Sequence, residues 1–84
     1  MSERKILQKL FSGSKNIRFP EMVTCVQAFG FHLARINGSH HIFVRDDIPE
    51  LVNLQNVKGQ TKPYQVKQFL KLVERYNLRL ENDQ

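Results

Sequence analysis

The stretch "FHLARINGSHHIFV", residues 31 to 44, decides the fold, because apolar residues recur at every second position on both sides of an Asn-Gly pair. This period of two is typical of strands that bury one face. Asn-Gly between two such runs predicts a tight hairpin, since both central residues of a type I′ turn need a positive φ. The stretch therefore predicts two antiparallel strands with Asn37 and Gly38 at the turn.

The turn also predicts which side chains share a face. The expected pairs are Ile36 with Ser39, Arg35 with His40, and Leu33 with Ile42. The fully apolar face, expected on the core side, holds Phe31, Leu33, Ile42 and Val44. Arg35 and His40 would then lie at the turn end of the core face. His41 would point to the opposite face, which the helices leave open.

The residues before the hairpin carry the pattern of a helix. Pro20 suits a first helical position, and Glu21 suits the first turn, where the helix dipole favours negative charge. Apolar residues with helical spacing follow at Met22, Cys25, Val26 and Phe29. Gly30 is placed to end the helix in a left-handed conformation. Cys25 lies on the apolar stripe, so we interpret it as a small core residue and not as a reactive thiol.

The residues after the hairpin predict a third strand and a last helix. In "ELVNLQNV", residues 50 to 57, Val52 and Leu54 share one face. The last helix is expected from Lys62-Pro63 to about Tyr76. Its apolar stripe consists of Val66, Phe69, Leu70 and Val73.

The N-terminal residues complete the predicted architecture. Residues 4–11, "RKILQKLF", predict a short helix that stops at Gly13, and residues 12–18 read as a linker. The whole chain is expected to be one α+β domain, with an N-terminal extension over 1–18 and a core over 19–80. That core is helix, three-stranded antiparallel sheet, helix, with both helices on one face of the sheet.

Positive charge is concentrated near the C-terminus. The net charge of the 84 residues is +5, and the segment 58–79 holds six basic residues against one acidic residue. Such a block favours a polyanion, most simply nucleic acid, or an acidic protein partner, although a solvated helix face is an alternative. A single cysteine, no long apolar run and no visible signal peptide together predict a cytoplasmic protein that does not enter a membrane.

The two adjacent histidines are the candidates for chemistry. His40 and His41 are expected on opposite faces of the strand, so they cannot chelate one metal together. No Cys or carboxylate lies at a zinc-like spacing, so no metal or cofactor is expected. Histidine is suited to proton transfer near neutral pH. From the residues alone, His40 is either a structural rim residue or a catalytic group.

Four segments, in this order, resemble the HicA family of bacterial toxins. They are "AFGF", "RINGSHHIF", "ELVNLQ" and "KGQTKPYQVKQFLKLVERYNL", within residues 20–78. The step Gly38-Ser39-His40 is the most specific mark. The sequence departs from many relatives at "NLQNV", where they have a proline and a histidine, and in its N-terminal segment.

The resemblance implies a fold like a double-stranded RNA-binding domain, an mRNA interferase that cleaves messenger RNA, and a neutralising HicB-type antitoxin. It implies that His40 is the essential histidine. Arg35 and Ser39 are then candidates for binding the scissile phosphate, and Lys58, Lys62 and Lys67 for binding the RNA backbone. Two other hypotheses stay open: a noncatalytic RNA-binding module of the same fold, and an interaction subunit whose basic helix meets an acidic protein.

Overall fold

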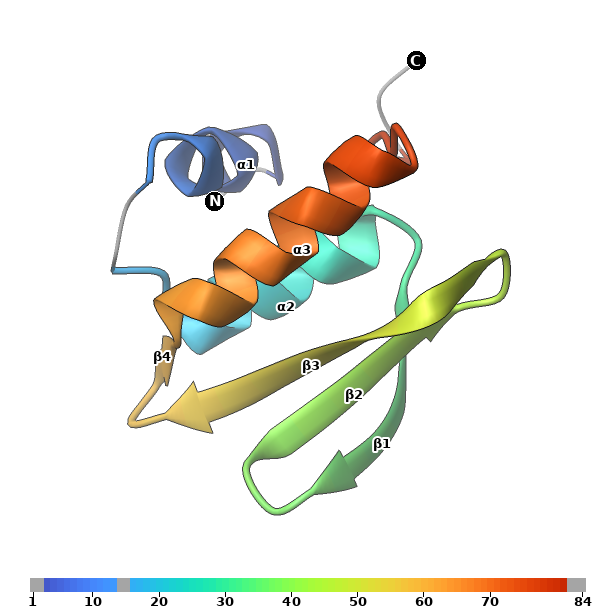
Figure 1. Cartoon of the computed structure of the whole chain (residues 1–84). Helices are drawn as coiled ribbons and strands as arrows, with labels where there is room; N and C mark the ends of the chain where they lie inside the picture. Colours follow the sequence, from blue (N-terminus) through green and yellow to red (C-terminus); the bar gives the residue numbers. More distant parts are fainter. Residues whose placement is uncertain (1–2, 14–15, 82–84) are drawn as a thin grey trace.

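The computed structural model describes residues 3–13 and 16–81 as three helices and four strands (Figure 1). Their order is α1 (Glu3–Phe11), α2 (Phe19–Ala28), β1 (His32–Asn37), β2 (His40–Arg45), β3 (Ile48–Val57), β4 (Gln60–Thr61) and α3 (Pro63–Arg75). The strands form one antiparallel sheet in the order β1-β2-β3-β4. The fold is α+β and like a double-stranded RNA-binding domain, as predicted.

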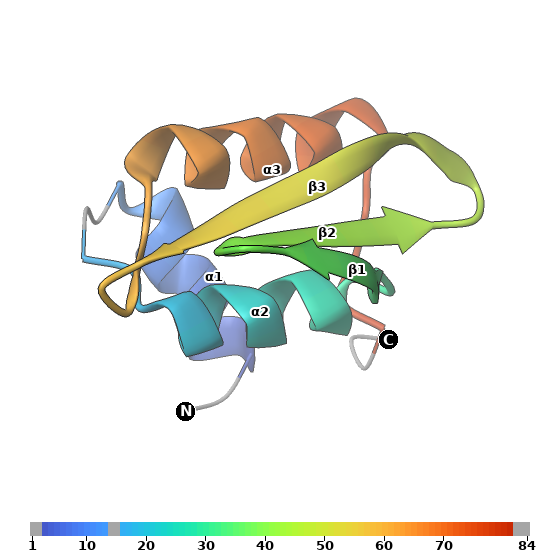
Figure 2. The same cartoon turned by 90° about the horizontal axis from the view of Figure 1, so that it is seen from below.

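The helices all lie on one side of the sheet. Figures 1 and 2 show α2 and α3 over one face, with α1 resting on these two helices on the side away from the strands. The other face of the sheet has no described helix over it. None of the helices in the described part of the chain has the length and apolar content that a bilayer-spanning helix needs.

The core is one cluster that all three helices and the sheet share. Its fully buried large side chains include Phe29, Phe43, Phe69, Ile6, Leu10, Ile17, Met22 and Leu54. Cys25 is 0% exposed, and burial raises the pKa of its thiol to about 12. The prediction that Cys25 is a core residue is confirmed, and the raised pKa disfavours the nucleophilic thiolate.

A short strand that the sequence analysis did not predict joins the sheet to the start of α2. Lys58 and Gly59 have φ values of 52° and 82° and turn β3 into β4, with Val57 paired to Gln60. The N–H of Phe19 donates to the carbonyl of Gly59 at 2.8 Å. Ile17 and Arg18, in the segment interpreted as linker, therefore lie along the sheet edge, whereas residues 14 and 15 are outside the described residues.

The predicted hairpin exists, but its turn lies one residue later than predicted, so each partner near the turn changes by two residues. Gly38 and Ser39 are the central residues, so Asn37 pairs with His40 and Ile36 pairs with His41. Gly38 has a φ of +63°, while Ser39 has no positive φ, which is the pattern of a type II′ turn and not of type I′. Glycine in the first central position thus decided the turn.

The later turn changes each partner by two residues, so Arg35, His40 and Ile42 still share a face, as predicted. The irregularity between Leu33 and Arg35 pairs Leu33 with Phe43 and not with Ile42, so the face of Phe43 is the core face and that of Ile42 is the open face. Phe43 is 1% exposed on the core side, together with Val52 and Leu54, as predicted for β3. Ile42 and Val44, expected in the core, are half-buried on the open face. Leu33 is 42% exposed because β1 is an edge strand that leaves the regular register at Ala34.

Candidate functional site

His40 is the first residue of β2, and its side chain lies on the sheet face that no described helix covers. It pairs with Asn37 on one side and Gln55 on the other, and its side chain is half-buried. Its Nδ1 lies 3.1 Å from Oδ1 of Asn53, two residues earlier on β3. One edge of the imidazole is therefore held by the protein, and Nε2 lies on the other edge.

His41 points to the opposite, helix-covered face. Its ring packs edge-on against Phe19 at the start of α2, with 4.7 Å between the ring centroids and 62° between the ring planes. Its Nδ1 lies 3.3 Å from the carbonyl of Ser39. The prediction that the two histidines point apart is confirmed. The assignment of their faces was wrong: His41, not His40, faces the core side, because the irregularity between Leu33 and Arg35 puts Phe43 and not Ile42 opposite Leu33.

Ser39 and Arg35 lie beside His40, but not as predicted. Arg35 pairs with Ile42, not with His40, so it shares the face of His40 as a diagonal neighbour. Ser39 is at the turn itself, where its Oγ accepts a hydrogen bond from Nε2 of Gln55 at 3.3 Å. The open face thus brings a histidine, a hydroxyl and a guanidinium to the same end of the sheet.

Two of the predicted lysines lie at this end. The N–H of Asn56 donates to the carbonyl of Ser39 at 3.0 Å, which places the β1–β2 turn next to the last residues of β3. Lys58 follows in the β3–β4 turn, and Lys62 is the N-cap residue of α3, with its Nζ 5.9 Å from the centre of the Tyr64 ring. The first turn of α3 has no acidic residue, so its N–H groups and dipole favour an anion there.

Lys67 is placed differently from these residues. It is exposed on α3, which lies over the face of the sheet opposite to the side chain of His40. Lys67 can extend a positive surface along the helix layer. It does not belong to the group of residues around the imidazole.

Arg18 is a cation of this end that the sequence analysis missed. It is the N-cap residue of α2 and forms a bridge with Gln60, next to the β3–β4 turn. Its N–H donates to Oε1 of Glu21 at 3.0 Å, and this hydrogen bond lowers the pKa of the Glu21 carboxyl. Pro20 marked the first turn of the helix, so Arg18, two residues before it, could have been considered as a cap.

The charges of the C-terminal basic segment are not equivalent. Arg75 forms a 2.7 Å ion pair with Glu50 of β3, at the far end of α3. Lys58 and Lys62 have no ion pair with any carboxylate among the residues that the structure describes. The positive charges of Lys58 and Lys62 are therefore uncompensated, and they lie at the same end of the sheet as His40.

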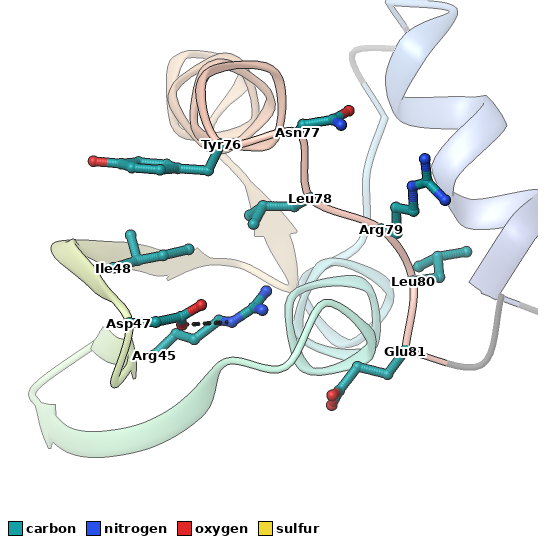
Figure 3. Close-up of a pocket in the computed structure, with 9 residues that line it drawn as sticks. All are labelled: Arg45, Asp47, Ile48, Tyr76, Asn77, Leu78, Arg79, Leu80 and Glu81. Atoms are coloured by element: carbon teal, nitrogen blue, oxygen red, sulfur yellow. Dashed lines mark ion pairs between the residues drawn. The ribbon is translucent and has the colours of Figure 1, made fainter. Parts of the chain in front are cut away.

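A groove of about 420 Å³ lies at the opposite end of the molecule (Figure 3). It holds Arg45 and Arg79 but also Asp47 and Glu81, so its charges balance. The guanidinium of Arg45 already has partners, because it pairs with Asp47 at 2.8 Å and donates to the carbonyl of Phe29 at 2.8 Å. This groove lacks the uncompensated charge that a phosphate site needs.

His40 and most of the residues around it belong to the part of the chain that matches a known family. The family model described as the HicA toxin of bacterial toxin-antitoxin systems matches residues 19–74, from the start of α2 to the last turn of α3. The match includes Gly38-Ser39-His40. No curated protein and no solved structure gives a significant match. The chain belongs to the HicA family of toxins from bacterial toxin-antitoxin systems.

Proposed function

We propose that this toxin is a metal-independent endoribonuclease that cleaves messenger RNA, with His40 as the group that removes a proton from the substrate. The observation that carries the proposal is the position of His40 on the open sheet face. Its Nδ1 is within hydrogen-bond distance of Oδ1 of Asn53, so Nε2 is the nitrogen that can reach a substrate. The family match and the cations at the same end support it.

The reaction needs no nucleophile from the protein, because RNA carries its own 2′-hydroxyl. Nε2 of His40 takes the hydroxyl proton, and the 2′ oxygen forms a bond to the adjacent phosphorus. The bond from phosphorus to the 5′ oxygen breaks, and that oxygen takes a proton from solvent. The products are a 2′,3′-cyclic phosphate and a 5′-hydroxyl. General base catalysis of this kind contributes about 10²–10⁴-fold.

The neighbouring residues supply the charge that the phosphate needs. Arg35 shares the face of His40 and would bind the scissile phosphate, with the hydroxyl of Ser39 as a second donor. Lys58, Lys62 and the start of α3 would hold the flanking backbone. Lys67 would add a contact further along α3. The RNA would therefore bend around the end of the sheet toward the helix layer.

The toxin-antitoxin family implies an antitoxin partner. We expect a HicB-type protein whose acidic groups meet the same cationic end and cover His40. Competition between RNA and antitoxin for one surface gives a simple mechanism of neutralisation, since each partner offers negative charge to the same lysines. A messenger RNA substrate also places the activity in the cytoplasm.

Cleavage by the purified toxin should proceed in EDTA without added Mg²⁺. The 2′-hydroxyl is activated by His40 in this mechanism, so removal of divalent cations should change the rate less than about threefold, against the 10²–10⁴-fold effect of the base. The products should carry 2′,3′-cyclic or 3′ phosphates, which mass spectrometry of a short RNA distinguishes. The control is His40→Ala purified in parallel, which reports contaminating nuclease. Strict dependence on Mg²⁺ with 5′-phosphate products would contradict the mechanism.

Charge reversal at Lys58 and Lys62 should weaken RNA binding for many sequences. The double variant Lys58→Glu/Lys62→Glu removes two backbone contacts, so we expect about tenfold or more weaker binding at low salt. The slope of log K against log salt should become shallower by roughly one to two units, because fewer counterions are released.

The matched control for this variant is Lys71→Glu/Arg79→Glu. It makes the same change in net charge on exposed residues further along α3 and beyond its end. Its binding should stay closer to that of the wild type. Fluorescence anisotropy at several salt concentrations measures both variants. Equal loss in the two would mean that binding follows net charge alone and not this end of the molecule.

A further inference from the structure

The contact between His40 and Asn53 has a chemical consequence for the imidazole. Oδ1 of an amide can only accept a hydrogen bond, so the nitrogen that faces it must carry the hydrogen. Nδ1 of His40 lies 3.1 Å from this oxygen, so a hydrogen bond between the two atoms requires the Nδ1–H form. In a neutral ring only one nitrogen carries a hydrogen, so Nε2 keeps its lone pair.

We propose that Asn53 is a positioning residue that fixes His40 as the Nδ1–H tautomer and aims Nε2 at the substrate. The inference rests on the proposed function, because it assigns a role to Asn53 in the same reaction. When Nε2 takes the proton of the 2′-hydroxyl, the ring becomes an imidazolium with two N–H groups. The hydrogen bond from Nδ1–H to Oδ1 is kept and gains strength, since its donor is now charged.

The strand that carries Asn53 is itself held in place. Gln65 of α3 is 3% exposed, and its Oε1 accepts a hydrogen bond from the N–H of Gln55 at 2.8 Å. The side chain of Gln55 donates to Ser39, the residue before His40. A buried side chain of the helix layer thus anchors β3 next to Asn53, and β3 anchors the turn that leads into His40. Supported in this way, the amide of Asn53 can orient a neighbouring ring.

Asn53 is exposed and its pairing partner on β2 is Ile42, so its truncation should leave the fold intact. The first measurement is the tautomer of each histidine in the complete toxin, from long-range ¹H–¹⁵N correlation spectra at a pH where the rings are neutral. In the wild type, His40 should be mainly Nδ1–H. In Asn53→Ala it should shift toward Nε2–H.

His41 is the internal control in the same spectra. Its Nδ1 faces the carbonyl of Ser39, not Asn53, so its tautomer should be unchanged in Asn53→Ala. The matched variant is Leu51→Ala, which truncates an exposed residue of the same strand two positions earlier. It should leave the tautomers of both histidines as they are in the wild type.

The second measurement is the single-turnover rate of RNA cleavage together with RNA affinity. A histidine base in the wrong tautomer costs up to about 10⁴-fold in buried triads. His40 is only half-buried and can exchange tautomers through water, so Asn53→Ala should reduce the rate constant by about tenfold to a hundredfold. RNA affinity should change less than threefold. Asn53→Asp keeps an acceptor oxygen, so it should keep the Nδ1–H tautomer and a higher rate constant than Asn53→Ala.

The two measurements separate this inference from the proposed function. An Nε2–H tautomer of His40 in the wild type, or an unchanged tautomer in Asn53→Ala, would overturn the role of Asn53 even if His40 is essential. A changed tautomer with an unchanged cleavage rate would overturn it as well. If His40→Ala itself cleaves RNA at the wild-type rate, the proposed function fails, whatever the tautomer is. The expected result is a shifted tautomer together with a slower rate at unchanged affinity.

Discussion

His40→Ala should lose RNA cleavage almost completely while the protein stays folded. The loss of a general base costs about 10²–10⁴-fold in the rate constant. Folding should be little affected, because the side chain is half-buried and its described hydrogen bond joins it to the exposed Asn53. We expect the free energy of unfolding to change by about 1 kcal/mol or less. Cleavage of a fluorescent RNA under single-turnover conditions and a thermal melt measure the two effects.

The neighbouring histidine is the matched control for this prediction. His41→Ala removes the edge-on contact with Phe19 and should lower the free energy of unfolding by about 1 kcal/mol. It should keep most of the cleavage activity, because His41 faces the helices. The two variants therefore differ in cleavage activity, while neither should lose more than about 1 kcal/mol of stability. A folded His40→Ala protein that cleaves at nearly the wild-type rate would remove His40 from the mechanism and favour a noncatalytic RNA-binding module.

The order and type of the main elements could be predicted from local patterns. The apolar stripe of α3 includes Val66, Phe69 and Val73, which are all buried in the structure. Val52 and Leu54 alternate correctly on β3. These residues pack into one core, so a period of 3.6 or 2 in the sequence is enough to find them. The short strand β4 was missed because two residues are too few to show a period.

The core face of the hairpin could not be predicted, because it depends on an irregularity in β1 that carries no local signal. Asn37-Gly38 as a type I′ turn and Gly38-Ser39 as a type II′ turn both satisfy the local rules for hairpins. Both turns place Arg35, His40 and Ile42 on one face and His41 on the other. The irregularity between Leu33 and Arg35, which pairs Leu33 with Phe43, is what puts His41 and not His40 on the core side. The packing against the third strand is consistent with this arrangement. Phe43 joins Val52 and Leu54 in the core, which buries an aromatic ring that the predicted arrangement, with Ile42 on the core side, would expose.

The residues that contact His40 depend on how β2 and β3 are paired. The resemblance to the HicA family indicated His40 whatever its face was. Asn53 could not be found in this way, since its contact with His40 exists only when β2 and β3 are correctly aligned. The pairing of residues 17–19 with Gly59–Thr61 likewise brings Arg18 next to the β3–β4 turn. Contacts between segments far apart in the sequence carry no local pattern.

The N-terminal helix lies outside residues 19–74, which match the family, but it is packed as a part of the core. Ile6 and Leu10 of α1 are each 2% exposed, and α1 rests on α2 and α3 (Figure 1). Lys9 pairs with Glu21, the residue that also accepts the N–H of Arg18 at the start of α2. The extension thus supports the end of α2 that lies near the candidate site.

Leu10→Ala should therefore destabilise the whole protein, although it lies outside the matched residues. Truncation of a buried leucine costs about 2–5 kcal/mol through lost burial and the cavity left behind. At roughly 4–8 °C per kcal/mol for a chain of this size, Tm should fall by about 10 °C or more. Phe11→Ala is the matched control, since Phe11 is the next residue but is 61% exposed, and its truncation should cost about 0.5 kcal/mol or less. Thermal and urea unfolding of the two variants measure the difference. Equal stability of Leu10→Ala and Phe11→Ala would mean that α1 is only loosely attached, and that residues 19–81 fold without it.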